Sequence, residues 1–584
     1  MSSEILRLDL SRAAVATWSI TDKRYRDWPI VYILDDNSRD STRHGKLVDV
    51  YVGESHNAVA RLRQHLSTPE KQHLKNVRVI LDETFNKSVC QDLESYLIRM
   101  LAGDGAYRVL NRNDGIIEGD YYQRDFYRER FRGIWDQLGI FTRSIPDIMN
   151  SDLFKLSPFK ALTEDQADSV EDIVKGLLAN LARGVGPSTT VVQGDPGTGK
   201  TVLAIYMIKL LIDIKTFGSP EDPDNSRFAE FFTEDNRDLL RGLRIGLVVP
   251  QQSLRESIKK VFRKTPGLHP SMVMTPFEVG ESQGQFDLLV VDETHRLSQR
   301  ANQPSGVLNA KFPVINAALF GSDDIHKTQL DWIRAKSRHQ ILLLDAAQSV
   351  RPADLPTSLL TSLVSYSRAA GHYFRLHTQM RCVQAGSDYI SYIRAFLDPR
   401  ARAPPPRREF PTYDFRLFDD LGAMHTAILQ RNAEVGLSRM VAGYAWEWKS
   451  KRQPQAFDIE VGGTRLRWNS TPTDWIASSK SIEEVGSIHT VQGYDLNYVG
   501  VIIGLDLRYN PQQKRLSVSR KAYFDKKGKE NNPVLGLTYD DADLLRFVTQ
   551  IYAVLLTRGV RGTYVYACDP GLREYLREFI PRPE

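Results

Sequence analysis

Cysteine is scarce in this chain of 584 residues, which has only three. Cys90, Cys382 and Cys568 lie too far apart to give the close spacings that ligate a metal. The sequence therefore excludes a cysteine-built metal site. The same scarcity is typical of a protein that stays reduced, so we expect a cytoplasmic location.

Long apolar runs and leader segments are also missing. The longest apolar runs are short and strand-like, as at 247–249 and 341–344, whereas a membrane-spanning helix needs about 20 apolar residues. The chain does not start with a basic segment followed by an apolar core. We therefore expect neither a membrane span nor secretion. No repeat with a period of about 20 to 50 residues is visible, which excludes a solenoid.

A large charge of one sign is absent as well. The chain has 77 lysines and arginines against 72 acidic residues, a net charge of +5, and 41% hydrophobic residues. So mild an excess is compatible with a nucleic-acid partner but does not indicate one. The composition is that of an ordinary globular protein, and the length predicts about three or four domains.

The clearest signal that is present is a glycine-rich segment between an apolar strand and a helical pattern. A loop of the form G-x-x-x-x-G-K-[ST] in this setting turns its backbone N–H groups toward a polyphosphate, and the helix N-terminus adds its dipole. Lys200 is expected to reach the β- and γ-phosphates, and Thr201 to hold Mg²⁺. We therefore predict a loop that binds ATP or GTP, made of Gly194, Asp195, Pro196, Gly197, Thr198, Gly199, Lys200 and Thr201.

Acidic and amide residues follow at the ends of other apolar strands. The run 288–291 ends in Asp292 and Glu293, so a buried strand would bring Asp292 to Mg²⁺ and Glu293 to the attacking water. Gln348 follows a further apolar strand and is able to sense the γ-phosphate. Gln166 is able to bind the adenine edge, or it is a surface residue. From residue 161 onward, buried strands alternate with amphipathic helices, which predicts parallel α/β sheets.

The later motifs continue the series in order, at 247–254, 342–348, 375–381, 487–493 and 552–561. Together with the phosphate loop, they resemble the two RecA-like domains of superfamily 1 helicases, over residues 161–569. The resemblance implies that Arg381 and Arg558 are arginine fingers that stabilise charge at the γ-phosphate; the alternative for either is a surface salt bridge. It also assigns Gly493 and Arg561 to the nucleotide site.

Within this superfamily the chain resembles the Schlafen-related helicase-like proteins of bacteria, through 290–297, 378–382 and 489–496. It departs from well-studied unwinding helicases in two respects. No long insertion supplies auxiliary subdomains, and Thr294-His295 replaces the usual residues after the acidic pair. The resemblance therefore implies translocation along a strand, or ATP-driven clamping, and leaves strand separation open.

A second set of polar residues precedes the motor motifs. Taken singly, tyrosines in strands are usually core residues, and an Arg/His pair one helical turn apart is usually a solvated face. The order is more informative: two strand tyrosines, an arginine and a histidine on one helix face, a carboxylate on a later helix and a final asparagine. These residues are Tyr32, Tyr51, Arg61, His65, Glu94 and Asn111. This order resembles the GIY-YIG nucleases over about residues 27–114, with signatures that read Ile30-Val31-Tyr32 and Tyr51-Val52-Gly53.

The chemistry that this resemblance implies is metal-dependent cutting of phosphodiesters. A single Mg²⁺, or Mn²⁺ as an alternative, held by Glu94 would activate water, and Arg61 would neutralise the phosphate. Tyr32 could act as a base only beside a metal or cation, because tyrosine has a pKa near 10. His65 would shuttle a proton or contact phosphate, Tyr51 would orient water or phosphate, and Asn111 would support the site. The alternative is an inert nucleic-acid-binding module.

Two segments lie outside these motifs. The helical stretch 121–138 mixes aromatics with arginines, and we favour a connecting helix that buries its aromatics over a nucleic-acid surface. The basic stretch 514–529 is either a phosphate-tracking segment or a solvated loop. We expect an α/β protein in four parts, namely a small α+β nuclease domain (1–115), a helical linker (116–160) and two RecA-like domains (161–365 and 366–584).

The sequence as a whole predicts an ATP-dependent nuclease–helicase that acts on single- or double-stranded DNA. Its motor would translocate along a strand or clamp it while the nuclease cuts. By analogy alone, such a protein suits defence against foreign DNA such as phage DNA. The alternatives are a nucleotide-controlled switch that binds nucleic acid without cutting, and an enzyme that cleaves RNA. The oligomeric state is not predicted.

Overall fold

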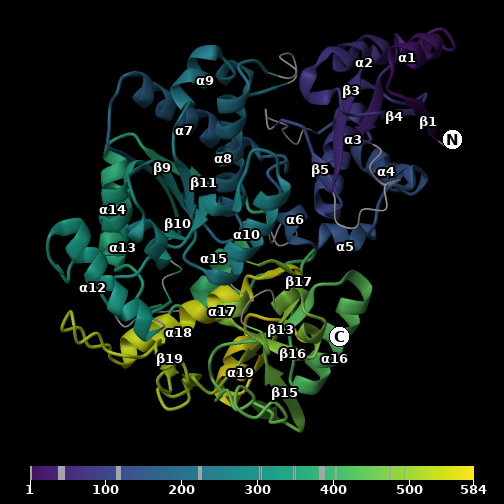
Figure 1. The fold of residues 1–584 in the computed structure, drawn as a ribbon. Coiled ribbons are helices and arrows are strands. Elements are labelled where there is room, and N and C mark those ends of the chain that lie inside the picture. Colours follow the sequence, from purple (N-terminus) through teal and green to yellow (C-terminus); the bar gives the residue numbers. More distant parts are fainter. Residues whose placement is uncertain are drawn as a thin grey trace. The chain divides into compact units, whose positions relative to one another are not determined.

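The computed structural model describes residues 3–36, 47–112, 120–220, 226–301, 303, 305–345, 348, 350–380, 388–401, 404–471, 475–491 and 494–583. The chain divides into two compact units. Figure 1 labels the helices and strands that build them. The first unit consists of Met1–Leu178, Ile205–Arg241 and Ile258–Pro270. The second consists of Ala179–Ala204, Gly242–Ser257 and Ser271–Glu584.

The first unit contains a five-stranded sheet. Its strands, in spatial order, are β1 (Glu4–Asp9), β4 (Asn76–Leu81), β2 (Ile30–Asp35), β3 (Val48–Ser55) and β5 (Tyr107–Val109). All neighbours are antiparallel except β3 and β5. Successive side chains of a strand point to opposite faces, so β2 places Val31 and Ile33 in one apolar cluster and Ile30, Tyr32 and Leu34 in another. The sheet is therefore buried on both faces.

Helices α2 (Ala58–Ser67) and α3 (Lys87–Asp104) supply the two clusters that cover these faces. Asn57 and Asn86 cap them, since each side chain accepts a hydrogen bond from a backbone N–H in the first helical turn. The other helices that begin in this unit are α1 (Arg12–Trp18), α4 (Arg124–Leu138), α5 (Ile145–Met149), α6 (Asp152–Lys155), α7 (Glu164–Ala182) and α9 (Glu234–Leu240).

Helix α4 carries the aromatic and basic stretch. It buries Tyr127, Phe131 and Trp135, while Phe126 stays exposed. Two of its arginines are engaged by acids of the same unit, Arg128 by Asp92 and Arg130 by Asp82. The helix therefore packs its aromatics as a connecting helix would.

The second unit contains a six-stranded, wholly parallel sheet. Its strands, in spatial order, are β11 (Tyr373–Leu376), β6 (Ser188–Gly194), β10 (Ser337–Leu344), β9 (Phe286–Val291), β7 (Ile245–Val248) and β8 (Val273–Met274). The helices between them are α8 (Lys200–Thr216), α10 (Gln252–Lys264), α11 (Pro276–Glu281), α12 (Gly306–Phe320), α13 (Gln329–Lys336) and α14 (Thr357–Ala369). Parallel neighbours require such crossovers, and all strand ends then meet at one edge.

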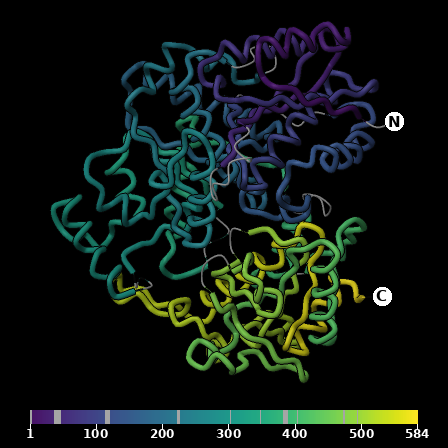
Figure 2. Tube along the Cα trace, turned by 45° about the vertical axis from the view of Figure 1, so that its right-hand side comes forward, coloured from purple at the N-terminus to yellow at the C-terminus, as the bar shows by residue number. Residues whose placement is uncertain are grey.

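The same unit contains a seven-stranded sheet, built by the last part of the chain, which Figure 2 colours green to yellow. Its strands, in spatial order, are β12 (Asp414–Leu417), β20 (Gly559–Ala567), β17 (Leu496–Ile503), β13 (Ser438–Ala442), β16 (Glu484–Ser487), β15 (Thr464–Trp468) and β14 (Ile459–Val461). Only the β14–β15 pair is antiparallel. Its helices are α15 (Asp388–Leu397), α16 (Leu421–Val435), α17 (Ile488–Val491), α18 (Asp541–Leu556) and α19 (Pro570–Arg577).

The basic stretch begins in a hairpin of β18 (Leu507–Asn510) and β19 (Arg515–Val518). Several of its charges have local partners. Arg520 pairs with Asp541, Lys527 pairs with Glu530, and Lys529 donates to main-chain carbonyls of the same stretch. These charges hold the segment to itself and to the start of α18.

The prediction of parallel α/β sheets is confirmed by both sheets of the second unit. The four domain limits stay a prediction. The five- and seven-stranded sheets each lie within one predicted part, whereas β11 of the six-stranded sheet lies beyond the limit predicted at residue 365. Among the helices of the described residues, none has the length and apolarity needed to cross a bilayer.

Candidate functional sites

The phosphate loop connects the end of β6 to the start of α8. Gly197 and Gly199 have φ angles of 86° and 76°, a region that side-chain-bearing residues rarely adopt. The loop is closed by Thr198, whose N–H and hydroxyl both donate to the Asp195 carbonyl, at 3.3 and 2.9 Å. Its shape is thus fixed by glycine conformation and by its own main chain.

Lys200 is held inside this loop. Its ammonium donates to the carbonyls of Gly194 and Asp195, at 2.7 and 3.0 Å, and the residue is only 6% exposed. A buried cation ringed by main-chain dipoles suits a polyphosphate anion.

The end of β9 meets the start of α8 beside the loop. The Thr201 hydroxyl donates to Asp292 Oδ2 at 2.6 Å, and Asp292 is completely buried. Burial, followed by the charge of Glu293, raises the pKa of Asp292 above its usual range. A hydroxyl and a carboxylate are hard oxygen donors of the kind that Mg²⁺ takes in nucleotide sites, so the residues present fit that ion.

Glu293 adopts a strained backbone conformation next to Asp292. Its φ of 49° lies in the left-handed region, which is uncommon for residues other than glycine and which clusters at functional sites. Burial acts to raise the pKa of this carboxyl, but nearby His295 and Lys200 outweigh it and lower the pKa. Glu293 is therefore ionised and can accept a hydrogen bond from water.

His295 is a further neighbour of Glu293, which the sequence marked only as a departure from the residues usual after the acidic pair. It is fully buried, and its Nε2 lies 3.1 Å from Glu293 Oε2. Its Nδ1 accepts the N–H of Asp345, at 3.3 Å. Because Nδ1 is the acceptor, the nitrogen that faces Glu293 carries the ring N–H.

An arginine that the motifs did not predict reaches the loop from the part of the chain that forms the seven-stranded sheet. Arg394, on α15, lies 2.6 Å from Asp195 Oδ1 and 3.2 Å from Asp345 Oδ2. Gln348 donates to the same Asp345 oxygen at 2.7 Å. A loop acid, the end of β10 and a helix of the other sheet thus meet in one polar cluster.

The segment before α15 also touches the loop. Gln379 donates to the Pro196 carbonyl at 2.7 Å, and the Met380 N–H donates to the Gly197 carbonyl at 2.8 Å. The predicted fingers lie elsewhere or outside the described residues. Arg558 is buried and donates to main-chain carbonyls of Val554 and Tyr494, Arg561 is exposed on β20, and Arg381 and Gly493 lie outside the described residues.

Gln166 lies in the first unit, at the start of α7. It is 1% exposed, and its Oε1 accepts the N–H of Thr163 at 3.1 Å. The residue is therefore not the surface residue that the sequence allowed as an alternative. Its proposed contact with adenine stays a prediction.

The polar residues of the N-terminal sheet gather around His65 of α2. Tyr32 Oη lies 2.8 Å from His65 Nε2, and the Tyr51 ring meets the imidazole edge-on with centroids 4.9 Å apart. Tyr32, Tyr51 and His65 are all buried. A Cβ on Gly53, which pairs with Tyr32 across the strands, would overlap the Tyr32 hydroxyl. The glycine therefore makes room for the tyrosine.

Lys71 joins this cluster, although no sequence pattern pointed to it. It lies in the single 3₁₀ turn Pro69–Lys71, with its Nζ 3.4 Å from His65 Nδ1 and 3.3 Å from the centroid of the Tyr51 ring. Burial, Lys71 and Arg61 together lower the pKa of His65 to about 2. The imidazole is therefore neutral.

The remaining predicted residues surround the cluster. Asn111 brackets Val52 of β3, accepting its N–H at 3.1 Å and donating to its carbonyl at 2.7 Å. Arg61 is half-buried on α2 and donates to Gln64. Glu94 is partly exposed on α3, and its charge, with that of Glu54, adds to the burial that raises the pKa of Cys90. Asn111 thus braces β3 at Val52.

The described residues contain no group of three or more His, Cys, Asp or Glu side chains placed to hold a metal by themselves. Mg²⁺ commonly takes one or two protein carboxylates and completes its shell with water and substrate phosphate. A magnesium site with Glu94 as its single protein ligand is compatible with this coordination.

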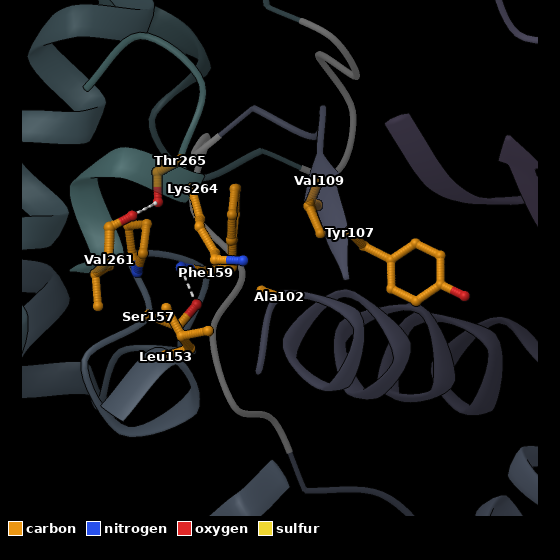
Figure 3. Close-up of a pocket in the computed structure, with 10 residues that line it drawn as sticks. Ala102, Tyr107, Val109, Leu153, Ser157, Phe159, Val261, Lys264 and Thr265 are labelled. Carbon is orange, nitrogen blue, oxygen red and sulfur yellow. Dashed lines mark hydrogen bonds between the residues drawn. The ribbon is translucent and has the colours of Figure 1, made fainter. Parts of the chain in front are cut away.

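A small pocket lies in the first unit, lined by α3, β5, the segment after α6 and the end of α10 (Figure 3). Lys264 reaches across it and donates to the Gly105 carbonyl. Its volume of about 10 Å³ is room for one water molecule. The pocket is therefore a packing gap, not a ligand site.

The chain also matches a known protein family. Residues 187–569 match the family described as Schlafen group 3, DNA/RNA helicase domain. The match contains the phosphate loop, the acidic pair and both parallel sheets.

Individual relatives are more distant. An uncharacterized protein of Saccharomyces cerevisiae, YPL245W, is 24% identical over 447 residues, which are 71% of this chain and 90% of the yeast protein. Among solved structures, the arterivirus helicase nonstructural protein 10 is 14% identical with a TM-score of 0.26, over 67% of this chain and 62% of the viral one. Its complex with DNA gives the same identity and score, over 69% and 66%. The chain thus spans less than two thirds of the viral protein.

Proposed function

Because the chain belongs to the Schlafen group 3 DNA/RNA helicase family, we propose that it is an ATP-driven nucleic-acid motor joined to a metal-dependent endonuclease that cuts DNA. The motor translocates along a strand or clamps it. The nuclease is of the GIY-YIG type and uses the polar cluster of the five-stranded sheet.

The observation that carries the motor is the meeting of Lys200, Thr201 and Asp292 at the phosphate loop. Lys200 binds the β- and γ-phosphates, and Glu293 orients the attacking water. Thr201 and Asp292 would hold Mg²⁺, which neutralises charge on the transferring phosphoryl group. Arg394 lies at the loop, and Arg381 and Arg558 are the proposed arginine fingers, a role that requires Arg558 to leave the carbonyls of Val554 and Tyr494. Gln166 holds the base.

The nuclease is supported by the buried contact between Tyr32 and His65, with Gly53 shaped to fit it. In this proposal the pair handles the proton of the attacking water. Arg61 neutralises the phosphate, Tyr51 orients it, and Asn111 keeps the end of β3 in place. Glu94 would hold the metal, whose chemistry is to polarise the scissile phosphate. Defence against foreign DNA is the role that such an enzyme would suit, by analogy.

One experiment separates the two activities. The full chain is incubated with single- and double-stranded DNA and RNA of the same sequence, with and without Mg²⁺ and ATP. Lys200→Ala should lower ATP turnover by about 100-fold or more while leaving the nuclease site intact. Glu94→Gln should lower cutting by about 100-fold or more while leaving ATP turnover unchanged.

Two exposed residues provide matched controls, Lys175→Ala on α7 and Glu83→Gln beside α3, and neither should change either rate. Cutting by Glu94→Gln at the wild-type rate would remove the nuclease assignment. If neither DNA nor RNA stimulates ATP turnover, the motor fails and a nucleotide-controlled binding switch takes its place. Cutting of RNA alone would make the protein a ribonuclease.

A further inference from the structure

The hydrogen bond between Tyr32 and His65 has a direction that the two atoms alone do not fix. Tyr32 Oη and His65 Nε2 lie 2.8 Å apart, and either could be the donor. A neutral imidazole carries one N–H and one lone pair, on opposite nitrogens. The partner of Nδ1 therefore decides what Nε2 does.

That partner is Lys71. Its Nζ lies 3.4 Å from His65 Nδ1, and an ammonium group has donors only. Nδ1 must then be the acceptor, so the ring proton sits on Nε2 and His65 donates to the Tyr32 oxygen. A doubly protonated ring is ruled out because burial, with Lys71 and Arg61, lowers the pKa of His65 to about 2.

Lys71 is itself fixed in place. The residue is 7% exposed, and its ammonium lies 3.3 Å from the centroid of the Tyr51 ring, within cation–π range. The lysine, both tyrosines and the histidine thus form one packed unit. Such an arrangement leaves little freedom for the imidazole to reverse its tautomer.

We infer that Lys71 is a positioning residue that fixes His65 in its Nε2–H tautomer and so directs a hydrogen bond onto the Tyr32 oxygen. This inference rests on the proposed nuclease function. An oxygen that receives a hydrogen bond, with a cation behind the donor, is better able to carry negative charge. After the phenol proton of Tyr32 has left to bulk water, this hydrogen bond stabilises the phenolate, which then takes the proton of the attacking water. An isolated tyrosine, with a pKa near 10, is too weakly acidic to ionise for this task.

The tautomer itself is the first test. Histidine labelled with ¹⁵N in the ring is introduced into the full chain, and the spectrum of His65→Gln identifies the His65 signals. Wild type should show protonated Nε2 and unprotonated Nδ1. Lys71→Met should move His65 toward the Nδ1–H form, and Lys71→Arg should keep the wild-type tautomer. A wild-type Nδ1–H ring, or no change in Lys71→Met, would overturn the inference.

Cutting of DNA is the second test. Lys71→Met should lower kcat by about 10- to 100-fold and leave KM for DNA within about twofold, because the lysine acts through His65 and not on the substrate. Lys71→Arg should recover most of the loss. The matched control is Lys75→Met, an exposed lysine whose ammonium donates to the Gln72 carbonyl, and it should cut normally.

The two tests separate the failure of this inference from the failure of the proposed function. If the wild-type chain cuts nothing, the nuclease proposal fails, while the ring nitrogens still report whether Lys71 sets the tautomer. If Lys71→Met changes the tautomer but keeps its full kcat, the role of Lys71 in cutting is disproved. Lys71→Arg, which keeps the charge and the fold, guards against a result caused by misfolding of Lys71→Met.

Discussion

The two candidate sites of this chain are built in opposite ways. The phosphate loop is made of eight consecutive residues, and its shape comes from main-chain conformation at Gly197 and Gly199. The cluster in the five-stranded sheet is made of side chains from separate strands and helices, around the buried His65. One site depends on backbone geometry, and the other depends on contacts between side chains.

This difference follows from the two kinds of sheet. Parallel strands all end at one edge, so the phosphate loop after β6 and Asp292 after β9 lie at the same edge, where Thr201 donates to Asp292. In the antiparallel sheet, Tyr32 and Tyr51 meet only because β2 and β3 pair in one register and α2 packs His65 against them. The second site should therefore tolerate fewer changes in its surroundings.

We expect the largest effect from Arg394, a side chain that contacts the phosphate loop, whose shape comes from its backbone conformation. Arg394→Ala removes the cation that links Asp195 of the loop to Asp345 of β10. We expect ATP turnover to fall by about 100-fold, because a positive group near the phosphate loop stabilises charge in the transition state. Steady-state hydrolysis with saturating DNA measures it.

The matched variant is Arg408→Ala. Arg408 is exposed and pairs with Asp388, which lies on α15, the helix that carries Arg394. This variant should turn over ATP at the wild-type rate, since exposed ion pairs contribute little. Wild-type turnover in Arg394→Ala would show that Arg394 only joins the two parts of the chain, and the loop would then be a purely main-chain site.

The next effect tests whether the side-chain site depends on the backbone. In Gly53→Ala the new Cβ would overlap the Tyr32 hydroxyl, so the ring must move away from His65. We expect DNA cutting to fall by about tenfold and the free energy of unfolding of this sheet to fall by about 1 to 3 kcal/mol. Cleavage rates and thermal unfolding measure the two effects.

Gly133→Ala on α4 is its control, because a Cβ there meets nothing within 4 Å. A helix-interior alanine should stabilise the chain slightly and leave cutting unchanged. If Gly53→Ala cuts like wild type, the contact between Tyr32 and His65 is not needed for cutting. The second site would then not depend on contacts between side chains.

The parts of this molecule that were predictable from the sequence share one property: their residues are close in sequence or repeat a period. The phosphate loop is contiguous, and apolar runs that end in acids predicted β9 with Asp292. Neither Lys71 nor Arg394 belongs to a contiguous motif or to a periodic pattern that would predict its contacts. Lys71 reaches His65 through a 3₁₀ turn. Arg394 is the one arginine of α15, a helix whose apolar positions indicate only that it packs against a core.

The predicted arginine finger Arg558 shows a second limit of prediction from sequence. The motif order pointed to Arg558, yet its guanidinium donates to the carbonyls of Val554 and Tyr494, close to its own strand and helix. Motif order identifies the residue type and the segment. It does not contain the torsion angles that decide whether a long side chain turns toward the loop or back onto its own fold.

The smallest effect compares two buried acids at ends of parallel strands. Asp292 follows β9 and contacts Thr201, whereas Asp506 follows β17 and accepts a hydrogen bond from Tyr552 at 2.7 Å. Burial raises the pKa of Asp506 to about 7. Because the folded pKa lies above the unfolded value, stability from the neutral acid is complete at low pH and is lost as the pH rises toward 7, by at most about 1.4 kcal/mol per pH unit.

Asp506→Asn has no titrating proton at this position and should flatten the fall in unfolding temperature between pH 5 and 7, a difference of about one to two degrees per pH unit for a chain of 584 residues. ATP turnover at pH 7 should stay unchanged, since Asp506 contacts Tyr552 and its own strand end. The exposed Glu409→Gln should melt like wild type at every pH. An equal pH dependence in Asp506→Asn and wild type would mean that Asp506 is ionised in the fold. In that case burial at a strand end would not be enough to tell a structural acid such as Asp506 from an acid of the proposed nucleotide site such as Asp292.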